Sequence, residues 1–291
     1  MRYEGPIYRP PSEADSLLIQ ATAGCPHNKC TFCMVYKQGP KYRVRPVSEV
    51  IEDMQEARRN LGDAVRTMFL PAGNSMAVPA DQLVEICQAA REIFPLLERI
   101  TVYGSSRTIL DKGEGDLRRL ARAGLSRVHV GLESGDDDVL RRIKKGTTRQ
   151  EQIEAGQMLV RAGIENSTYV MLGIGGRART RAHAQATASA ISRIRPDCVR
   201  VRTFLPKVNT PLLREIEKGE FEVVSPYEAL TELRTLIAGV ECETGLASDH
   251  YTNYVNAEGV LPRDRKRLLE MVDRALAMDE GCFRPVYVGS Q

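Results

Sequence analysis

Six strand-like runs alternate with amphipathic helical runs between residues 16 and 206, and this alternation restricts the chain to an α/β fold. The runs are SLLIQAT (16–22), VRTMFL (65–70), RITVYG (99–104), RVHVGLES (127–134), STYVMLG (167–173) and CVRVRTFLP (198–206). Strands that alternate with helices form a parallel sheet with right-handed crossovers. Six units are too few for a closed eight-stranded barrel. The pattern therefore predicts an open curved sheet or a doubly wound sheet.

Capping signals predict where several helices begin. The candidates are Ser48 as an N-cap, Thr148 with Glu151 and Ser225 with Glu228 as capping boxes, and Thr210 before Pro211. The strand rhythm stops after residue 207 and only helical patterns follow. We therefore predict an N-terminal lead-in over 1–15, an α/β core over 16–207 and a helical C-terminal extension over 208–291.

Composition places the chain among ordinary globular proteins. Hydrophobic residues make up 42% of the 291 residues, which is enough for a substantial core. A net charge of +3 gives no case for a nucleic-acid or membrane-surface partner. No run approaches the roughly 18 apolar residues that would span a bilayer. The polar, proline-rich start is unlike a secretory signal, so a reducing cytoplasm is the expected compartment.

Three cysteines follow the first predicted strand within nine residues: Cys25, Cys30 and Cys33, in CPHNKCTFC. Three thiolates can ligate three irons of a cubane iron–sulfur cluster and leave the fourth iron open for another ligand. A zinc site with His27 as fourth ligand is the alternative, although His27 lies between two of the cysteines in a tight loop. The other four cysteines, Cys87, Cys198, Cys242 and Cys282, are scattered and are expected to be free thiols.

The cysteine loop resembles the cluster-binding motif of the radical S-adenosylmethionine (radical SAM) superfamily. The usual motif has three residues between its first two cysteines, whereas four stand here; the second gap of two fits. GCPHNKCTFCMVY is similar to a group of uncharacterised radical SAM proteins with this longer gap, related to the oxygen-independent coproporphyrinogen oxidase-like set. The resemblance implies an open (β/α)6 partial TIM barrel that binds a [4Fe–4S] cluster and SAM. Cys25, Cys30 and Cys33 would then ligate iron, with Phe32 packing near the adenine.

Ligands in parallel α/β folds gather at the carboxyl ends of the strands. After the second and third strands the sequence offers Gly73, Asn74, Ser75 and Ser105, which the resemblance places at SAM. Arg107 follows closely and could pair with the SAM carboxylate or a substrate acid, because guanidinium groups suit carboxylates.

The fourth strand ends in Glu133 and Ser134, predicted to contact SAM or substrate. A carboxylate after an apolar strand is costly to bury without a partner, which favours a functional Glu133. Gly173 after the fifth strand would lie beside the adenine, and Arg202 on the sixth, near the mouth, is also predicted to bind the cofactor. We predict Glu133 and Arg107 as catalytic residues and treat His129 as structural.

The resemblance implies an enzyme that reductively cleaves SAM and directs a 5′-deoxyadenosyl radical at a small-molecule substrate. It would need an electron donor such as flavodoxin or ferredoxin. Cleavage of another carbon–sulfur bond, giving a 3-amino-3-carboxypropyl radical, is one alternative. A non-catalytic iron–sulfur or zinc-binding regulatory module is the other. No nucleic-acid-binding module is evident, so such a partner is not expected.

Overall fold

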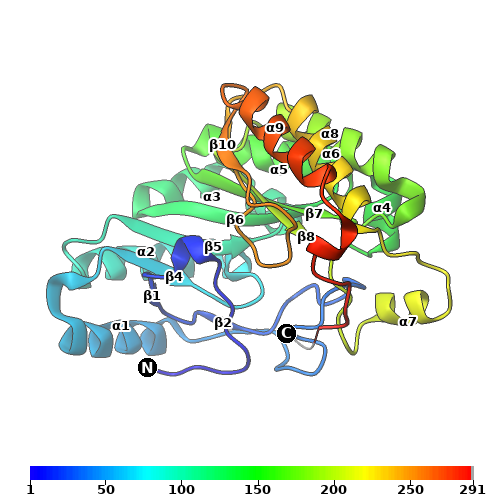
Figure 1. The fold of residues 1–291 in the computed structure, drawn as a ribbon. Coiled ribbons are helices and arrows are strands. Elements are labelled where there is room, and N and C mark those ends of the chain that lie inside the picture. Colours follow the sequence, from blue (N-terminus) through cyan, green and yellow to red (C-terminus); the bar gives the residue numbers. More distant parts are fainter. Residues whose placement is uncertain (290–291) are drawn as a thin grey trace.

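A computed structural model describes residues 1–289 and contains one large sheet with strand order β1-β4-β5-β6-β7-β8-β9-β10 (Figure 1). The strands are β1 (Leu17–Leu18), β4 (Thr67–Leu70), β5 (Arg99–Gly104), β6 (Leu125–Glu133), β7 (Glu165–Leu172), β8 (Cys198–Thr203), β9 (Thr244–Ala247) and β10 (Glu258–Leu261). Neighbours from β1 to β9 run parallel, and β10 pairs antiparallel with β9. The sheet is open, with β1 and β10 at its edges. The predicted open α/β fold with six successive parallel strands is confirmed.

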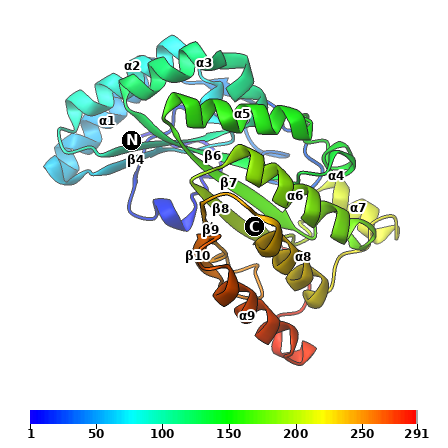
Figure 2. The same ribbon diagram turned by 90° about the horizontal axis from the view of Figure 1, so that it is seen from above.

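The helices are α1 (Val47–Leu61), α2 (Ala80–Ile93), α3 (Ser106–Ala123), α4 (Asp137–Arg142), α5 (Arg149–Ala162), α6 (Thr180–Ile194), α7 (Pro211–Glu217), α8 (Pro226–Gly239) and α9 (Arg265–Leu276). The longer ones lie in an arc along one face of this sheet, in which α1, α2, α3, α5, α6, α8 and α9 each pack against the next (Figure 2). The capping boxes at Thr148 and Ser225 and the cap at Thr210 are confirmed by their hydrogen bonds. The Ser48 cap is wrong: α1 begins at Val47, and Pro46 precedes it without a side-chain cap.

The two faces of the sheet differ in chemistry. The helix-facing side chains are apolar and fully buried, such as Met68, Val102, Val128 and Val199. Each side chain of this kind stabilises the fold by about 1.5–3 kcal/mol when it leaves water. The opposite face, called here the inner face, carries Phe69, Tyr103, His129, Tyr169, Arg200 and Arg202. Ring centroids 5.6 Å apart in His129 and Tyr169 place these two side chains together on it.

The first predicted strand divides in two. Only Leu17–Leu18 pairs with β4, whereas β2 (Thr22–Ala23) pairs antiparallel with β3 (Arg43–Val44). Residues 24–42 form the connection between β2 and β3, and this connection contains the three cysteines. The two-stranded ladder therefore closes the base of the cysteine loop.

The C-terminal part contains α7, α8 and α9 and also two strands that the sequence did not predict. The segments TGLA and EGVL are four residues long and each contains a glycine, so neither shows a clear strand pattern. They extend the sheet beyond β8, with β9 parallel to β8 and β10 antiparallel to β9. Among the helices of residues 1–289, none has the length and apolar character needed to cross a membrane.

The N-terminal segment covers the amino edge of the inner face through Glu13, at the end of a 3-10 helix (Pro11–Glu13). Its buried carboxylate accepts hydrogen bonds from Arg127 at 3.0 Å and Ser16 at 2.7 Å and lies 3.2 Å from Nε2 of His129. Burial alone would raise the pKa of Glu13, but the bonds with His129 and Ser16 and the charge of Arg99 lower it to about 2. His129 is accordingly a buried structural residue.

Candidate metal and cofactor site

The cysteine loop (residues 25–33) is fixed against the connection between α4 and α5. The Thr31 amide donates to the Ile143 carbonyl at 2.9 Å, and Nε2 of His27 lies 2.7 Å from the Lys144 carbonyl oxygen. His27 is thus engaged with the backbone of this connection, which argues against its service as a fourth zinc ligand. The loop is held at the carboxyl edge of β6, where the sheet's ligands were expected.

Gly73 brings the end of β4 into contact with the same loop. Its amide donates to the Gly24 carbonyl at 3.2 Å, and a Cβ at residue 73 would lie 2.6 Å from the Cβ of Cys25. The preceding Ala72 has a φ of 87°, which non-glycine residues rarely adopt. Only glycine allows this close approach at residue 73, so the position is fixed by contact with the first cysteine.

The three cysteines have the chemistry of an iron–sulfur ligand set. All are free, and all are partly exposed. Burial, with a further contribution from the nearby Cys33 and Cys25 thiols and against the charge of Lys145, raises the pKa of Cys30 to about 11. Thiolates that disfavour one another's ionisation are stabilised together by a cationic centre. The residues therefore fit a [4Fe–4S] cluster.

A single metal ion is less well accommodated in the part of the chain that the structure describes. Over residues 1–289 no three His, Cys, Asp or Glu side chains converge on one ion-sized point. A cubane makes a different demand, because it presents a separate iron to each thiolate.

Glu133 lies beside the cysteine loop and is paired with Lys145, a residue that sequence reasoning missed. Oε1 of Glu133 is 3.0 Å from Nζ of Lys145, and both side chains are 12% exposed. Glu133 has a φ of 61°, and the β6–β7 register shifts between Gly131 and Glu133. Burial would lower the pKa of Lys145, but the charges of Glu133 and Cys30 raise it. The sequence around Lys145, Lys-Lys-Gly before α5, gives little indication that this lysine lies beside the cysteines.

Asn74 and Ser105 are brought together at the ends of β4 and β5. Nδ2 of Asn74 donates to Oγ of Ser105 at 3.0 Å, and Ser105 caps α3 in a capping box with Thr108. Ser75 lies apart from them, because its hydroxyl donates to the carbonyls of Leu70 and Pro71. These side chains fix the turn, and their contact with SAM stays a prediction.

Ser134 and Gly173 belong to a buried polar network behind the strand ends. Oγ of Ser134 lies 2.8 Å from Nδ1 of His183, while the Gly173 amide donates to Oε2 of Glu232 at 2.6 Å. Burial lowers the pKa of His183 to about 4 and raises that of Glu232 to about 8. Gly173 packs closely against Val224, because a Cβ at residue 173 would lie 2.5 Å from Cγ2 of Val224.

The remaining predicted residues lie in three different surroundings. Phe32 packs against the apolar cluster that contains Leu140 and Ile143. Arg107 is on the first turn of α3 with a side chain 65% exposed, 3.8 Å from Glu151, and so lies on the surface. Arg202 lies on the inner face and is partly exposed. Roles for Phe32 at the adenine and for Arg107 in catalysis stay predictions.

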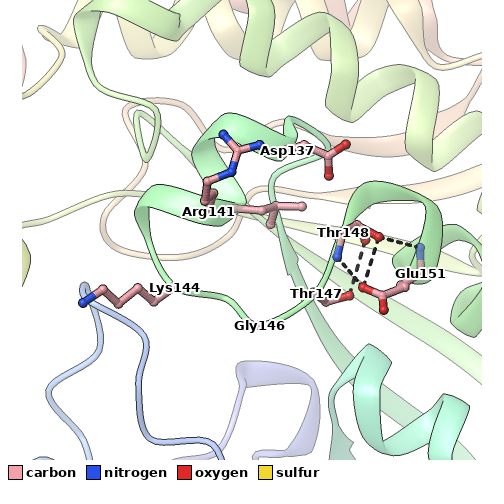
Figure 3. A pocket seen from close by; sticks show the side chains of 8 residues that line it. Asp137, Arg141, Lys144, Gly146, Thr147, Thr148 and Glu151 are labelled. Carbon is pink, nitrogen blue, oxygen red and sulfur yellow. Dashed lines mark hydrogen bonds between the residues drawn. The ribbon is translucent and has the colours of Figure 1, made fainter.

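An open depression lies beside the α4–α5 connection (Figure 3). Asp137, Arg141, Lys144 and Thr148 are among its lining residues, and Thr148 is already bonded to Glu151 in the capping box. Two of its lining residues, Thr148 and Glu151, form the capping box of α5.

An open parallel sheet with three cysteines at its carboxyl edge defines an α/β protein suited to hold an iron–sulfur cluster. A family model described as the radical SAM superfamily matches residues 19–181, more than half of the chain. The chain belongs to the radical SAM superfamily, which uses a [4Fe–4S] cluster and SAM.

Relatives among curated proteins are distant. A tRNA-2-methylthio-N(6)-dimethylallyladenosine synthase of Chlorobium phaeobacteroides is 28% identical over 193 residues, covering 62% of this chain and 40% of the relative. A 4′-phospho-dehydrooxetanocin synthase of Priestia megaterium is 27% identical over 172 residues, covering 51% of this chain and 22% of the relative. The chain thus spans well under half the length of either relative.

Solved structures share the fold at low identity. Methylornithine synthase superimposes with a TM-score of 0.56 at 17% identity, covering 88% of this chain and 68% of that one. Coproporphyrinogen III oxidase from Escherichia coli gives a TM-score of 0.57 at 16% identity, with coverages of 77% and 51%. These similarities confirm the partial-barrel fold.

Proposed function

We propose that this protein reductively cleaves SAM and directs the resulting 5′-deoxyadenosyl radical at a small-molecule substrate. The observation that carries the proposal is the cysteine loop, which is fixed on one side by Gly73 and on the other by the connection that contains Lys145. Cys25, Cys30 and Cys33 would hold the cluster, and when bound the cluster supplies the electron that breaks the sulfonium bond.

The chain's own residues position the cofactors and shield the cysteines. Lys145 places a buried positive charge near Cys30 and Cys33, which favours an electron-rich cluster. Glu133 balances that charge from the end of β6. Gly73 and Asn74 offer backbone and amide groups at the neighbouring strand end, and Phe32 supplies an apolar surface. Reduction would come from a donor such as flavodoxin or ferredoxin.

A small molecule is the proposed substrate although several relatives are tRNA-modifying enzymes by their names. The matched parts are 34% to 44% of the lengths of those relatives, and the net charge of +3 here gives little attraction for polyanions. The experiment can include tRNA as an alternative substrate and so contradict this choice.

The test is an anaerobic assay of the reconstituted protein with dithionite and SAM, with products identified by mass. We expect 5′-deoxyadenosine from the wild type, and loss of both iron and product in Cys25→Ala, Cys30→Ala and Cys33→Ala. Cys282→Ala, at an exposed free cysteine, is the matched control and should behave as wild type. Methylthioadenosine as the product would instead indicate the 3-amino-3-carboxypropyl route. Cleavage retained in all three loop variants would contradict the proposal.

A further inference from the structure

The inner face of β7 and β8 carries polar side chains that cluster binding does not use. Tyr169 stands opposite Arg200 in the strand register, and Met171 stands opposite Arg202. Arg200 is held by Asp249, with its Nη2 3.0 and 2.8 Å from the two carboxylate oxygens. Arg202 has no such partner: within residues 1–289 it makes neither a side-chain hydrogen bond nor an ion pair. The charge of Arg200 is therefore balanced by Asp249, whereas the positive charge of Arg202 on the same face is free to bind an anion.

Further positive groups surround Arg202. Burial and the charge of Arg202 lower the pKa of Lys207, which follows β8. The same two causes lower the pKa of His250 to about 4, and Lys207 and Arg200 add to the effect against Asp249. Lys207 also lacks an ion pair to any residue that the structure describes. A partly buried region with this excess of positive charge attracts anions.

The hydroxyl of Tyr169 is a second, independent sign of a missing partner. Its oxygen is buried and has no hydrogen-bond partner among the described residues. Buried polar atoms are nearly always hydrogen-bonded, so such a group indicates a bound water or ligand. The charges of Arg200 and Arg202 act on Tyr169, which places its ring in the same neighbourhood.

We propose that Arg202, with Lys207 and the Tyr169 hydroxyl, binds a carboxylate or phosphate group of the small-molecule substrate. A guanidinium group forms paired, charge-assisted hydrogen bonds with either anion.

The assignment to substrate rests on the proposed function, because SAM itself also carries a carboxylate. Position in the sheet favours the substrate: Arg202 is on β8, four strands from β4, whose end contacts Cys25. Neighbouring strands are about 4.8 Å apart, so the two sites stand well separated along the sheet. The sequence predicted instead that Arg202 binds SAM, and the experiment must distinguish this role from substrate binding.

The experiment is anaerobic calorimetry of the reconstituted protein, with inorganic phosphate and SAM titrated separately. Arg202→Gln removes the charge, and Arg122→Gln, at an exposed arginine on α3, is the matched control. We expect saturable phosphate binding by wild type and Arg122→Gln, and a loss of affinity of about tenfold or more in Arg202→Gln. SAM affinity should change by less than about twofold in the same variant.

Two further variants separate charge from folding. Arg202→Lys keeps the charge without the paired geometry and should lose less affinity than Arg202→Gln. Lys207→Gln should also weaken phosphate binding. Equal phosphate affinity in wild type and Arg202→Gln, or no saturable binding by wild type, would overturn the proposal. Weakened SAM binding with unchanged phosphate binding would assign Arg202 to the cofactor and overturn it too.

The same titrations separate this inference from the proposed function. If the wild type fails to cleave SAM, the phosphate titration still reports whether the anion site exists. If SAM is cleaved but phosphate does not bind, only the anion site is rejected.

Discussion

Oε1 of Glu133 lies 3.0 Å from Nζ of Lys145, and this ion pair joins the end of β6 to the connection before α5. The same connection holds the cysteine loop through the carbonyls of Ile143 and Lys144. The pair therefore stabilises the support of the proposed cluster site. Buried pairs of this kind are costly to break on one side, because the remaining charge stays buried without compensation.

Replacing Lys145 by Met should destabilise the protein by about 3 kcal/mol, because Glu133 would be left buried and unpaired. Iron content after reconstitution should fall as well, since the positive charge near Cys30 is lost. Urea unfolding and iron analysis measure both effects. The double variant Glu133→Gln/Lys145→Met should recover much of the lost stability. Additive losses in the double variant would show that the two side chains are not coupled.

Gly131 leaves the space that the Glu133–Lys145 pair occupies. A Cβ at residue 131 would lie 2.4 Å from Oε1 of Glu133 and 2.8 Å from Nζ of Lys145. Both atoms end long side chains, so Gly131→Ala should displace the pair and preserve the backbone, at a cost of about 1–3 kcal/mol. Gly115→Ala on α3 is the control, because no atom lies within 4 Å of a Cβ there. Equal unfolding midpoints for Gly131→Ala and wild type would refute this role.

Glu13→Gln should lower stability at neutral pH by about 3 kcal/mol and flatten its acid dependence. The pKa of Glu13 is lowered to about 2 in the folded protein, from an ordinary 4.5. Its stabilising effect is therefore fully present above pH 4.5 and is lost as the pH falls toward 2. Denaturant unfolding between pH 2 and 7 measures the difference between variant and wild type. Glu98→Gln, in an exposed pair with Arg66, should follow the wild-type curve. Parallel curves for Glu13→Gln and wild type would exclude a contribution from this carboxylate.

The stability of the wild type should fall as the pH rises, and Glu232→Gln should abolish this fall. Burial raises the pKa of Glu232 to about 8, so the folded protein binds a proton that the unfolded chain releases near pH 4.5. Stability therefore falls between these two values. His183 has the opposite effect but only below about pH 6.5, since its pKa is lowered to about 4.

The range from pH 6.5 to 8 isolates Glu232 from His183. Glutamine keeps an acceptor for the Gly173 amide, so Glu232→Gln should unfold with little change over this range. Wild type and Glu154→Gln, an exposed control on α5, should both lose stability. A wild-type curve that rises toward pH 8 would contradict the protonated state of Glu232.

The strand and helix order was predictable because its signals are local. Apolar runs and capping boxes, such as Thr148 with Glu151, depend on residues close in sequence. The cap at Ser48 failed because Pro46 fixes the start of α1 by its own backbone geometry. Strands β9 and β10 escaped notice because they are short and contain glycine, and they depend on pairing with β8 and with each other.

The site was predictable only where residue type itself determines the chemistry. The cysteines were evident from their spacing, whereas Lys145 is placed beside them by the register shift at β6 and the turn before α5. The isolation of Arg202 depends on Asp249, 47 positions further along, pairing with Arg200. Arg107 was predicted to be catalytic because it follows a strand end, but its side chain lies on the surface of α3.

Glu13 also has a consequence for the order in which the chain folds. Its partners Arg99, Arg127 and His129 stand 86 to 116 positions away in sequence. Contacts of such separation form late, because the intervening chain must first be ordered. During synthesis the segment around Glu13 therefore emerges before β6 but can dock only after β6 has left the ribosome. Until then the amino edge of the inner face is uncovered, and that interval is when we expect the nascent chain to be most open to aggregation.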